Sequence, residues 1–87
     1  MAIVFIPAQL RNLTNGTEQL ELDVRNVRQV IDELEARFPG IKERLCDGEE
    51  LSPSIQVCVG QTLSSRGMGT RIEADNEVHF LPAIGGG

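Results

Sequence analysis

A chain of 87 residues is long enough for one domain and too short for two, and without Trp or Tyr its core must consist mainly of Val, Ile and Leu. The formal net charge of −5 argues against binding to nucleic acid or anionic membranes, which require a basic surface, and favours a partner with a positive face.

The two cysteines, Cys46 and Cys58, form no CxxC motif, so we expect reduced thiols in a cytoplasmic protein rather than a disulfide framework or a zinc site. The opening stretch MAIVFIPAQL is too short for a signal peptide or a membrane-spanning helix, has no positive leading region, and is interrupted by Pro7.

The first two predicted elements are β-strands. Residues 2–6 (AIVFI) are apolar on both alternating faces, which is typical of an interior strand. Residues 18–24 (EQLELDV) alternate between apolar and polar side chains and predict a half-buried strand. The apolar positions of this second strand are Leu20, Leu22 and Val24. Asn15-Gly16 lies between the two runs, and because both residues tolerate positive φ we expect an antiparallel hairpin.

Residues 26–40 (NVRQVIDELEARFPG) predict the main helix. Its apolar residues recur at helical spacing and form one stripe, which consists of Val27, Val30, Ile31, Leu34 and Phe38. Asn26 stands at the N-cap position, Gln29 three residues later completes the pattern of a capping box, and Pro39-Gly40 ends the helix. A helix with a single apolar face must cover a sheet in order to bury that face.

The second half of the chain predicts two further strands, at residues 54–60 (SIQVCVG) and 77–82 (EVHFLP), because both alternate. The residues expected to point inward are Ile55, Val57, Val59, Val78 and Phe80. Those expected on the other face are Gln56, Cys58, His79 and Leu81. Residues 42–54 (KERLCDGEELSPS) read as a loop with room for a turn of helix, and residues 64–70 (SSRGMGT) as a glycine-rich connection.

The element order strand, strand, helix, strand, strand predicts an α+β fold of the β-grasp type. In this arrangement the last strand returns to the middle of a mixed sheet of four to five strands, beside the first, and one main helix covers one face. The other face of the sheet is then partly open. We expect residues 1–82 to form this domain and residues 83–87 to form a flexible glycine tail.

Nothing in the chain predicts a self-sufficient catalyst or a bound cofactor. A single histidine excludes a histidine-based metal cluster, and a pair of His79 and Cys58 on neighbouring strands would lack the third group that orients a catalytic base. We therefore interpret His79 as a surface histidine and Cys58 as an exposed strand residue. Residues 66–71 (RGMGTR) lack the third glycine of a phosphate-binding loop, and residues 47–50 (DGEE) are interpreted as a solvated charged turn rather than a cation site.

The ending LPAIGGG carries the strongest chemical signal. A carboxylate is a poor electrophile until it is joined to AMP at the expense of ATP, and for this it must reach the nucleotide inside a partner's site. Gly85, Gly86 and Gly87 have no side chains to obstruct a narrow passage, and an extended backbone can pair with its walls. Pro82, whose φ is fixed, stiffens the point at which the tail leaves the last strand. The alternative interpretation is a frayed end or a cloning remnant.

The segments NVRQVIDELEARFPGI, SIQVCV and DNEVHFLPAIGGG resemble the ubiquitin-like sulfur carriers of the MoaD/ThiS family, and the resemblance covers the whole chain. It implies a β-grasp fold and a terminal glycine that a ThiF/MoeB-type enzyme adenylates with ATP and that then becomes a thiocarboxylate. By this resemblance Gly87 bears the sulfur and Gly86 is its small neighbour. The open sheet face, with Leu81 and Cys58, is the expected docking surface for partners, and Pro82 and Ile84 are further candidate docking residues.

Within the family, the segments IPAQLRNLTNG, LEARFPGIKERL and LPAIGGG are most similar to carriers of cysteine biosynthesis, the CysO type. This likeness implies a cysteine-synthase-like enzyme as sulfur acceptor and a metalloprotease that releases the product. Two alternatives stay open. One is the small subunit of molybdopterin synthase, which works with a large synthase subunit, and the other is a ubiquitin-like covalent modifier of proteins.

Overall fold

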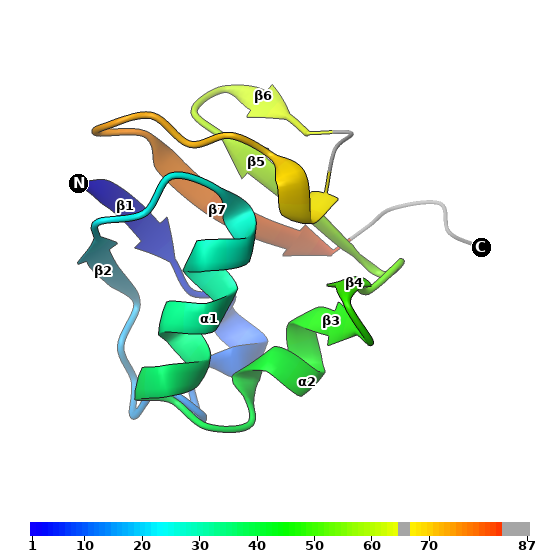
Figure 1. Cartoon of the computed structure of the whole chain (residues 1–87). Helices are drawn as coiled ribbons and strands as arrows, with labels where there is room; N and C mark the ends of the chain where they lie inside the picture. Colours follow the sequence, from blue (N-terminus) through cyan, green and yellow to red (C-terminus); the bar gives the residue numbers. More distant parts are fainter. Residues whose placement is uncertain (65–66, 83–87) are drawn as a thin grey trace.

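A mixed β-sheet with a helix across one face forms the centre of the computed structural model, which describes residues 1–64 and 67–82 (Figure 1). Within these residues the main sheet has five strands in the order β2-β1-β7-β5-β6. They are β1 (Ala2–Phe5), β2 (Gln19–Leu22), β5 (Ile55–Val59), β6 (Thr62–Leu63) and β7 (Glu77–Pro82). β1 and β7 run parallel, and the other neighbours are antiparallel. The predicted β-grasp fold is confirmed.

The middle of the sheet joins strands from the two halves of the chain. Val4 of β1 faces Val78 of β7, and both side chains are fully buried. On the other side of β7, Phe80 pairs with Val57 of β5, and these two are also buried. β-Branched and aromatic side chains pack well on a pleated surface, which is why these apolar runs form strands. The last strand thus returns beside the first, as the sequence predicts.

Helix α1 (Val27–Arg37) covers the inner face of the sheet (Figure 1). Four members of the predicted stripe are fully buried: Val27, Val30, Ile31 and Leu34. The fifth, Phe38, is the C-cap residue and is half-buried.

Polar side chains define the start of α1. Asn26 accepts a hydrogen bond from the backbone N–H of Gln29 at 2.9 Å, which confirms the predicted N-cap. The side chain of Gln29 in turn accepts from the backbone N–H of Arg25 at 2.7 Å. The return bond of the predicted capping box therefore closes on Arg25, one residue before the N-cap, rather than on Asn26 itself.

The connection between β1 and β2 is longer than a tight hairpin turn. Asn15 and Gly16 adopt φ values of 56° and 83°, as the sequence predicts, and the two strands pair antiparallel. A 3₁₀ helix, η1 (Ala8–Leu10), lies between β1 and these two residues. Thr14 is fully buried, and its hydroxyl donates to the carbonyl of Thr17 at 2.9 Å. The antiparallel pair is confirmed, but a folded loop takes the place of a two-residue turn.

Residues 42–54, predicted as a loop with room for a turn of helix, contain that turn and a small hairpin that was not predicted. Helix α2 (Ile41–Leu45) is followed by a hairpin of β3 (Cys46–Asp47) and β4 (Glu50–Leu51). The short strand β6 and a second 3₁₀ helix, η2 (Gly67–Gly69), were likewise not predicted. Strands of two residues and a 3₁₀ helix of three are too short to show a period, so contacts with the rest of the fold decide them.

Burial and hydrogen bonds explain why α2 forms. Ile41 and Leu45 lie one helical turn apart and are both fully buried. The carboxylate of Glu35 on α1 accepts hydrogen bonds from the backbone N–H groups of Gly40 and Lys42, where α2 begins. These bonds satisfy donors that a helix start leaves unpaired. Neither α1, α2 nor any other helix in the described part of the chain is long and apolar enough to cross a membrane.

Candidate functional site

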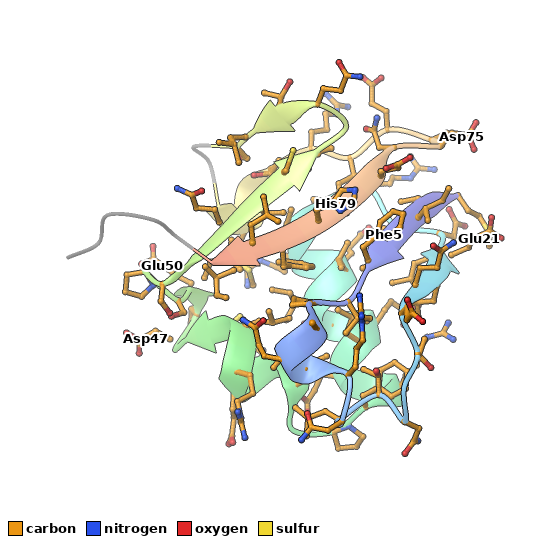
Figure 2. The ribbon with its side chains drawn as sticks, turned by 180° about the vertical axis from the view of Figure 1, so that it is seen from behind. Phe5, Glu21, Asp47, Glu50, Asp75 and His79 are labelled. Atoms are coloured by element: carbon orange, nitrogen blue, oxygen red, sulfur yellow. The ribbon has the colours of Figure 1, made fainter. Side chains whose placement is uncertain are left out.

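The sheet face opposite α1, called the outer face below, contains two of the predicted docking residues, Cys58 and Leu81. Side chains alternate along a strand, so one set of residues lies on this face across all five strands. The outer face consists of Ile3, Phe5, Gln19, Glu21, Gln56, Cys58, Leu63, Glu77, His79 and Leu81. Figure 2 views the molecule from this side, and Phe5 and His79 lie together near the middle of the sheet.

His79 contacts two other residues of the outer face, Phe5 and Glu77. Its ring stacks on Phe5, with the ring centroids 4.2 Å apart and the planes at 8°. The carboxylate of Glu77 lies 3.1 Å from Nε2 of His79 and accepts its hydrogen bond when that nitrogen carries a proton. Sequence reasoning missed both partners. The spacing of Glu77 and His79, two apart on one strand, indicated a shared face, whereas no local signal showed the neighbour on β1.

Cys58 lies directly opposite His79 in the antiparallel pair of β5 and β7, which is the pairing that the sequence suggested. The expectation that no third group orients the histidine is corrected, because Glu77 occupies that role. The thiol of Cys58, however, donates to the carbonyl of Gly60 at 3.6 Å, and His79 Nε2 faces Glu77. The two side chains are thus engaged with other groups, and the arrangement supports a binding surface better than a nucleophile with its base.

An exposed leucine marks the end of β7. Leu81 remains 40% exposed at the end of the sheet where β7 stops, and Cys58 is half-buried on the same face. The backbone of Pro82 is the last position of β7 and pairs with Ile55. Two of the predicted docking residues, Leu81 and Cys58, therefore share one face. The remaining predicted positions, Ile84 and Gly85 to Gly87, lie outside the described residues.

Cys46 and the acidic turn lie away from the outer face. Cys46 is buried, and burial raises the pKa of its thiol, so it stays protonated at neutral pH. The turn between β3 and β4 contains Gly48, which has a φ of 71°, and its acidic neighbours Asp47, Glu49 and Glu50 are exposed. Across residues 1–64 and 67–82, no three His, Cys, Asp or Glu side chains come together as metal ligands.

These features define the chain as a ubiquitin-like β-grasp protein, with its first and last strands paired in the centre of a mixed sheet. More specifically, the chain belongs to the ThiS family, whose model matches residues 4–87.

Individual relatives support this membership. The chain is 34% identical over 89 aligned positions to the sulfur carrier protein CysO of Mycobacterium bovis, and the alignment covers 97% of this chain and 96% of that protein. It is similar to a chain in the crystal structure of the Amycolatopsis orientalis BexX/CysO complex, with a TM-score of 0.89, 34% identity and 100% of both chains covered. The Mycobacterium tuberculosis CysO structure matches with a TM-score of 0.86 and 31% identity, over 97% of this chain and 100% of that one. The archaeal protein SAMP1 from Haloferax volcanii, at 23% identity and a TM-score of 0.76 over 99% of this chain and 98% of that one, shares the fold.

Proposed function

We propose that this chain is a sulfur carrier whose Gly87 carboxylate is activated by a ThiF/MoeB-type enzyme and converted to a thiocarboxylate. The observation that carries the proposal is the 34% identity to sulfur carrier proteins over 97% of the chain. The match to the ThiS family model extends through Gly87, which supports assigning the chemistry to that residue. The fold supports it too, because β5 and β1 hold β7 on either side and β7 leads directly into residues 83–87.

The carrier acts as a co-substrate, and the catalytic groups and the ATP belong to its partner. In the first step a carboxylate oxygen of Gly87 attacks the α-phosphorus of ATP, and pyrophosphate leaves. In the second step sulfide attacks the carbonyl carbon and AMP leaves, so that one oxygen is exchanged for sulfur. The glycines Gly85 and Gly86 suit this role because they add no side chains to the segment that must enter the partner's site.

We propose cysteine biosynthesis as the pathway, since the relatives named above that share 31% identity or more are CysO proteins. The acceptor enzyme would be cysteine-synthase-like and would use an activated serine. The thiocarboxylate sulfur bonds to the serine β-carbon, whose bond to the activating group breaks, and that group leaves as phosphate or acetate. The acyl group then moves from sulfur to the nearby amine, which leaves cysteine in amide linkage to Gly87. A metalloprotease is then required, because an amide bond does not hydrolyse unaided on a useful timescale.

The test of the carrier function uses the chain ending at Gly87, the ThiF/MoeB-type enzyme of the same organism, ATP and sodium sulfide. Intact-mass spectrometry should show a gain equal to the replacement of one oxygen by sulfur. A matched chain ending at Gly85, and a reaction without ATP, should show no gain. An unchanged mass with an active cognate enzyme would refute the proposal.

A second experiment tests the pathway separately. The charged carrier is mixed with the cysteine-synthase-like enzyme and O-phosphoserine or O-acetylserine, and its mass should rise by one cysteine residue. If it instead sulfurates a molybdopterin precursor together with a large synthase subunit, the pathway is wrong and the carrier chemistry stands. Isopeptide conjugates on lysines of other proteins would identify a covalent modifier.

A further inference from the structure

The last three residues of β7 are held in the sheet from one side. β1 accompanies β7 only as far as His79, so within the described part of the chain residues 80–82 have β5 as their one neighbouring strand. On the other side, Phe80 and Leu81 border a hollow of about 210 Å³. The place from which the chain continues into residues 83–87 therefore depends on how firmly the start of β5 is held.

The hydrogen-bonded pair nearest to the end of β7 is Gln56 and Leu81. The backbone N–H of Gly60 donates to the carbonyl of Glu77 at 2.7 Å, and bonded and non-bonded pairs alternate along an antiparallel ladder. By this alternation Gln56 and Leu81 exchange hydrogen bonds, and the next pair, at Pro82, does not. Because proline has no N–H, its place at a non-bonded position costs the ladder no hydrogen bond.

A β-turn at residues 52–55 fixes the start of β5. The backbone N–H of Ile55 donates to the carbonyl of Ser52 at 2.9 Å, which closes a four-residue turn with Pro53 at its second position. The hydroxyl of Ser52 accepts a hydrogen bond from the backbone N–H of Ser54 at 3.3 Å and lies 2.9 Å from the hydroxyl of Ser54. Serine at the first position and proline at the second are favoured, because the hydroxyl binds the turn backbone and the ring fixes φ.

The turn is joined to the core at both ends. The backbone N–H of Ser52 donates to the carbonyl of Leu45 at 2.9 Å, and Leu45, the last residue of α2, is fully buried. At the other end, Ile55 packs against the buried cluster and lies opposite Pro82 in the register. A continuous set of backbone contacts therefore leads from α2 through the turn to the end of β7.

We propose that Ser52 and Pro53 are positioning residues for the activation of Gly87, because the turn that they form holds the end of β7 in register. The inference rests on the proposed function and adds two residues that act through β5 and not on the carboxylate itself. Ordering the backbone of one residue costs a factor of about five to thirty in an equilibrium. A loose turn lets the last pairs of β7 open, so a smaller fraction of bound carrier places its carboxylate at the nucleotide.

The test is ATP–pyrophosphate exchange catalysed by the cognate ThiF/MoeB-type enzyme at varied carrier concentration. The double variant Ser52→Ala/Pro53→Gly removes the hydroxyl acceptor and frees φ in the turn. Its kcat should fall at least about fivefold, because the strand end must be ordered anew in each complex. Its KM should stay within about twofold of wild type, because no strand side chain has changed.

Two further variants control for the general effects of these substitutions. Pro39→Gly makes the same proline change in the loop between α1 and α2, away from the end of β7, and its kcat should stay within about twofold of wild type (Figure 1). Ser52→Thr keeps a hydroxyl at the first position of the turn and should restore most of the kcat that Ser52→Ala loses.

Hydrogen exchange followed by NMR reports the strand end directly. The amide of Leu81 should exchange at least about fivefold faster in the double variant than in wild type. The amide of His79, which lies where β1 and β5 both flank β7, should exchange at the wild-type rate. Circular dichroism and urea midpoints establish that each variant is folded, and Ser52→Ala alone replaces the double variant if the latter is unfolded.

The outcomes separate this inference from the proposed function. Wild-type carrier that is not adenylated by its cognate enzyme overturns both. If wild type is adenylated and the folded turn variant has the same kcat as Pro39→Gly, only the positioning role is overturned. A raised KM with unchanged kcat would assign the turn to partner binding, and a loss of kcat that Ser52→Thr does not restore would show that the hydroxyl is not the cause. Either result also overturns the positioning role.

Discussion

Val4 and Val78 face each other across the parallel pair of β1 and β7, fully buried, so the first and last strands of the chain hold the centre of the sheet together. The buried cluster that contains them also contains Leu34 of α1. A small domain with one such cluster has little redundancy, because it buries a modest share of its surface. Damage to any of these three elements should therefore lower the stability of the whole domain.

Leu34→Ala should lower the free energy of unfolding by about 2–5 kcal/mol, because a fully buried side chain is replaced by a cavity. Urea denaturation followed by circular dichroism measures the change. The exposed neighbour Asp32 provides the control, and Asp32→Ala should stay within about 0.5 kcal/mol of wild type. An unchanged midpoint for Leu34→Ala would contradict the packing of α1 on the sheet.

Asn26→Ala should cost about 1 kcal/mol, because the backbone N–H of Gln29 loses the side-chain acceptor that caps α1. The same denaturation assay applies. Asn12→Ala removes an exposed asparagine from the loop between β1 and β2 and should have a much smaller effect. If the two variants lost the same free energy of unfolding, the cap would contribute nothing specific to this helix.

Glu35 should make the stability of the domain depend on pH. Hydrogen bonds from the backbone N–H groups of Lys42 and Gly40 hold the pKa of this carboxyl below its ordinary value of 4.5. Because the pKa is lower in the folded state, ionised Glu35 stabilises the folded domain above pH 4.5. This stabilisation is lost as the pH falls through the pKa of Glu35 in the folded state. Glu35→Gln should therefore lower the urea midpoint at neutral pH, and the difference in urea midpoint between this variant and wild type should become smaller in acid. Glu43→Gln, on the exposed side of α2, is the control, and a gap for Glu35→Gln that widens in acid would contradict the sign.

The two cysteines should react at very different rates with iodoacetamide at neutral pH. Cys58 is half-buried on the outer face, whereas Cys46 is buried and its thiol pKa is raised by burial. Alkylation needs an accessible thiolate, so Cys58 should be labelled at least about tenfold faster. Peptide mass spectrometry over time measures both rates, and labelling in urea should remove the difference. Faster labelling of native Cys46 would show that the segment from α2 to β3 opens readily.

One alanine added after Gly87 should abolish charging with sulfur, since the carboxylate would be displaced from the site that accepts it, and should leave the urea midpoint unchanged. The matched control adds one alanine before Met1 and should charge normally. Intact-mass spectrometry reports both the added sulfur and any trimming of the extension. An untrimmed, extended chain that still acquires sulfur would refute the assignment of the chemistry to the carboxylate of Gly87.

The sequence by itself was sufficient to predict the longer helix and strands and the order in which they follow one another. α1, β2, β5 and β7 each bury one face along a run long enough to show its period, and the burial of those faces requires a sheet with a helix across it. The N-cap at Asn26 and the positive φ at Asn15-Gly16 were likewise predictable, because they depend on the chemistry of single residues. The assignment of sulfur chemistry to Gly87 also comes from the sequence and stays a prediction, since residues 83–87 lie outside the described structure.

Only the tertiary structure decided the short elements and the arrangement of the outer face. α2 depends on Glu35 reaching across from α1, a contact that no local period reveals. Phe5 and His79 come from opposite ends of the chain, and they stack only because the parallel register of β1 and β7 sets them side by side. Register follows from the packing of every buried side chain in both strands at once, so it is a property of the assembled core and not of either segment alone.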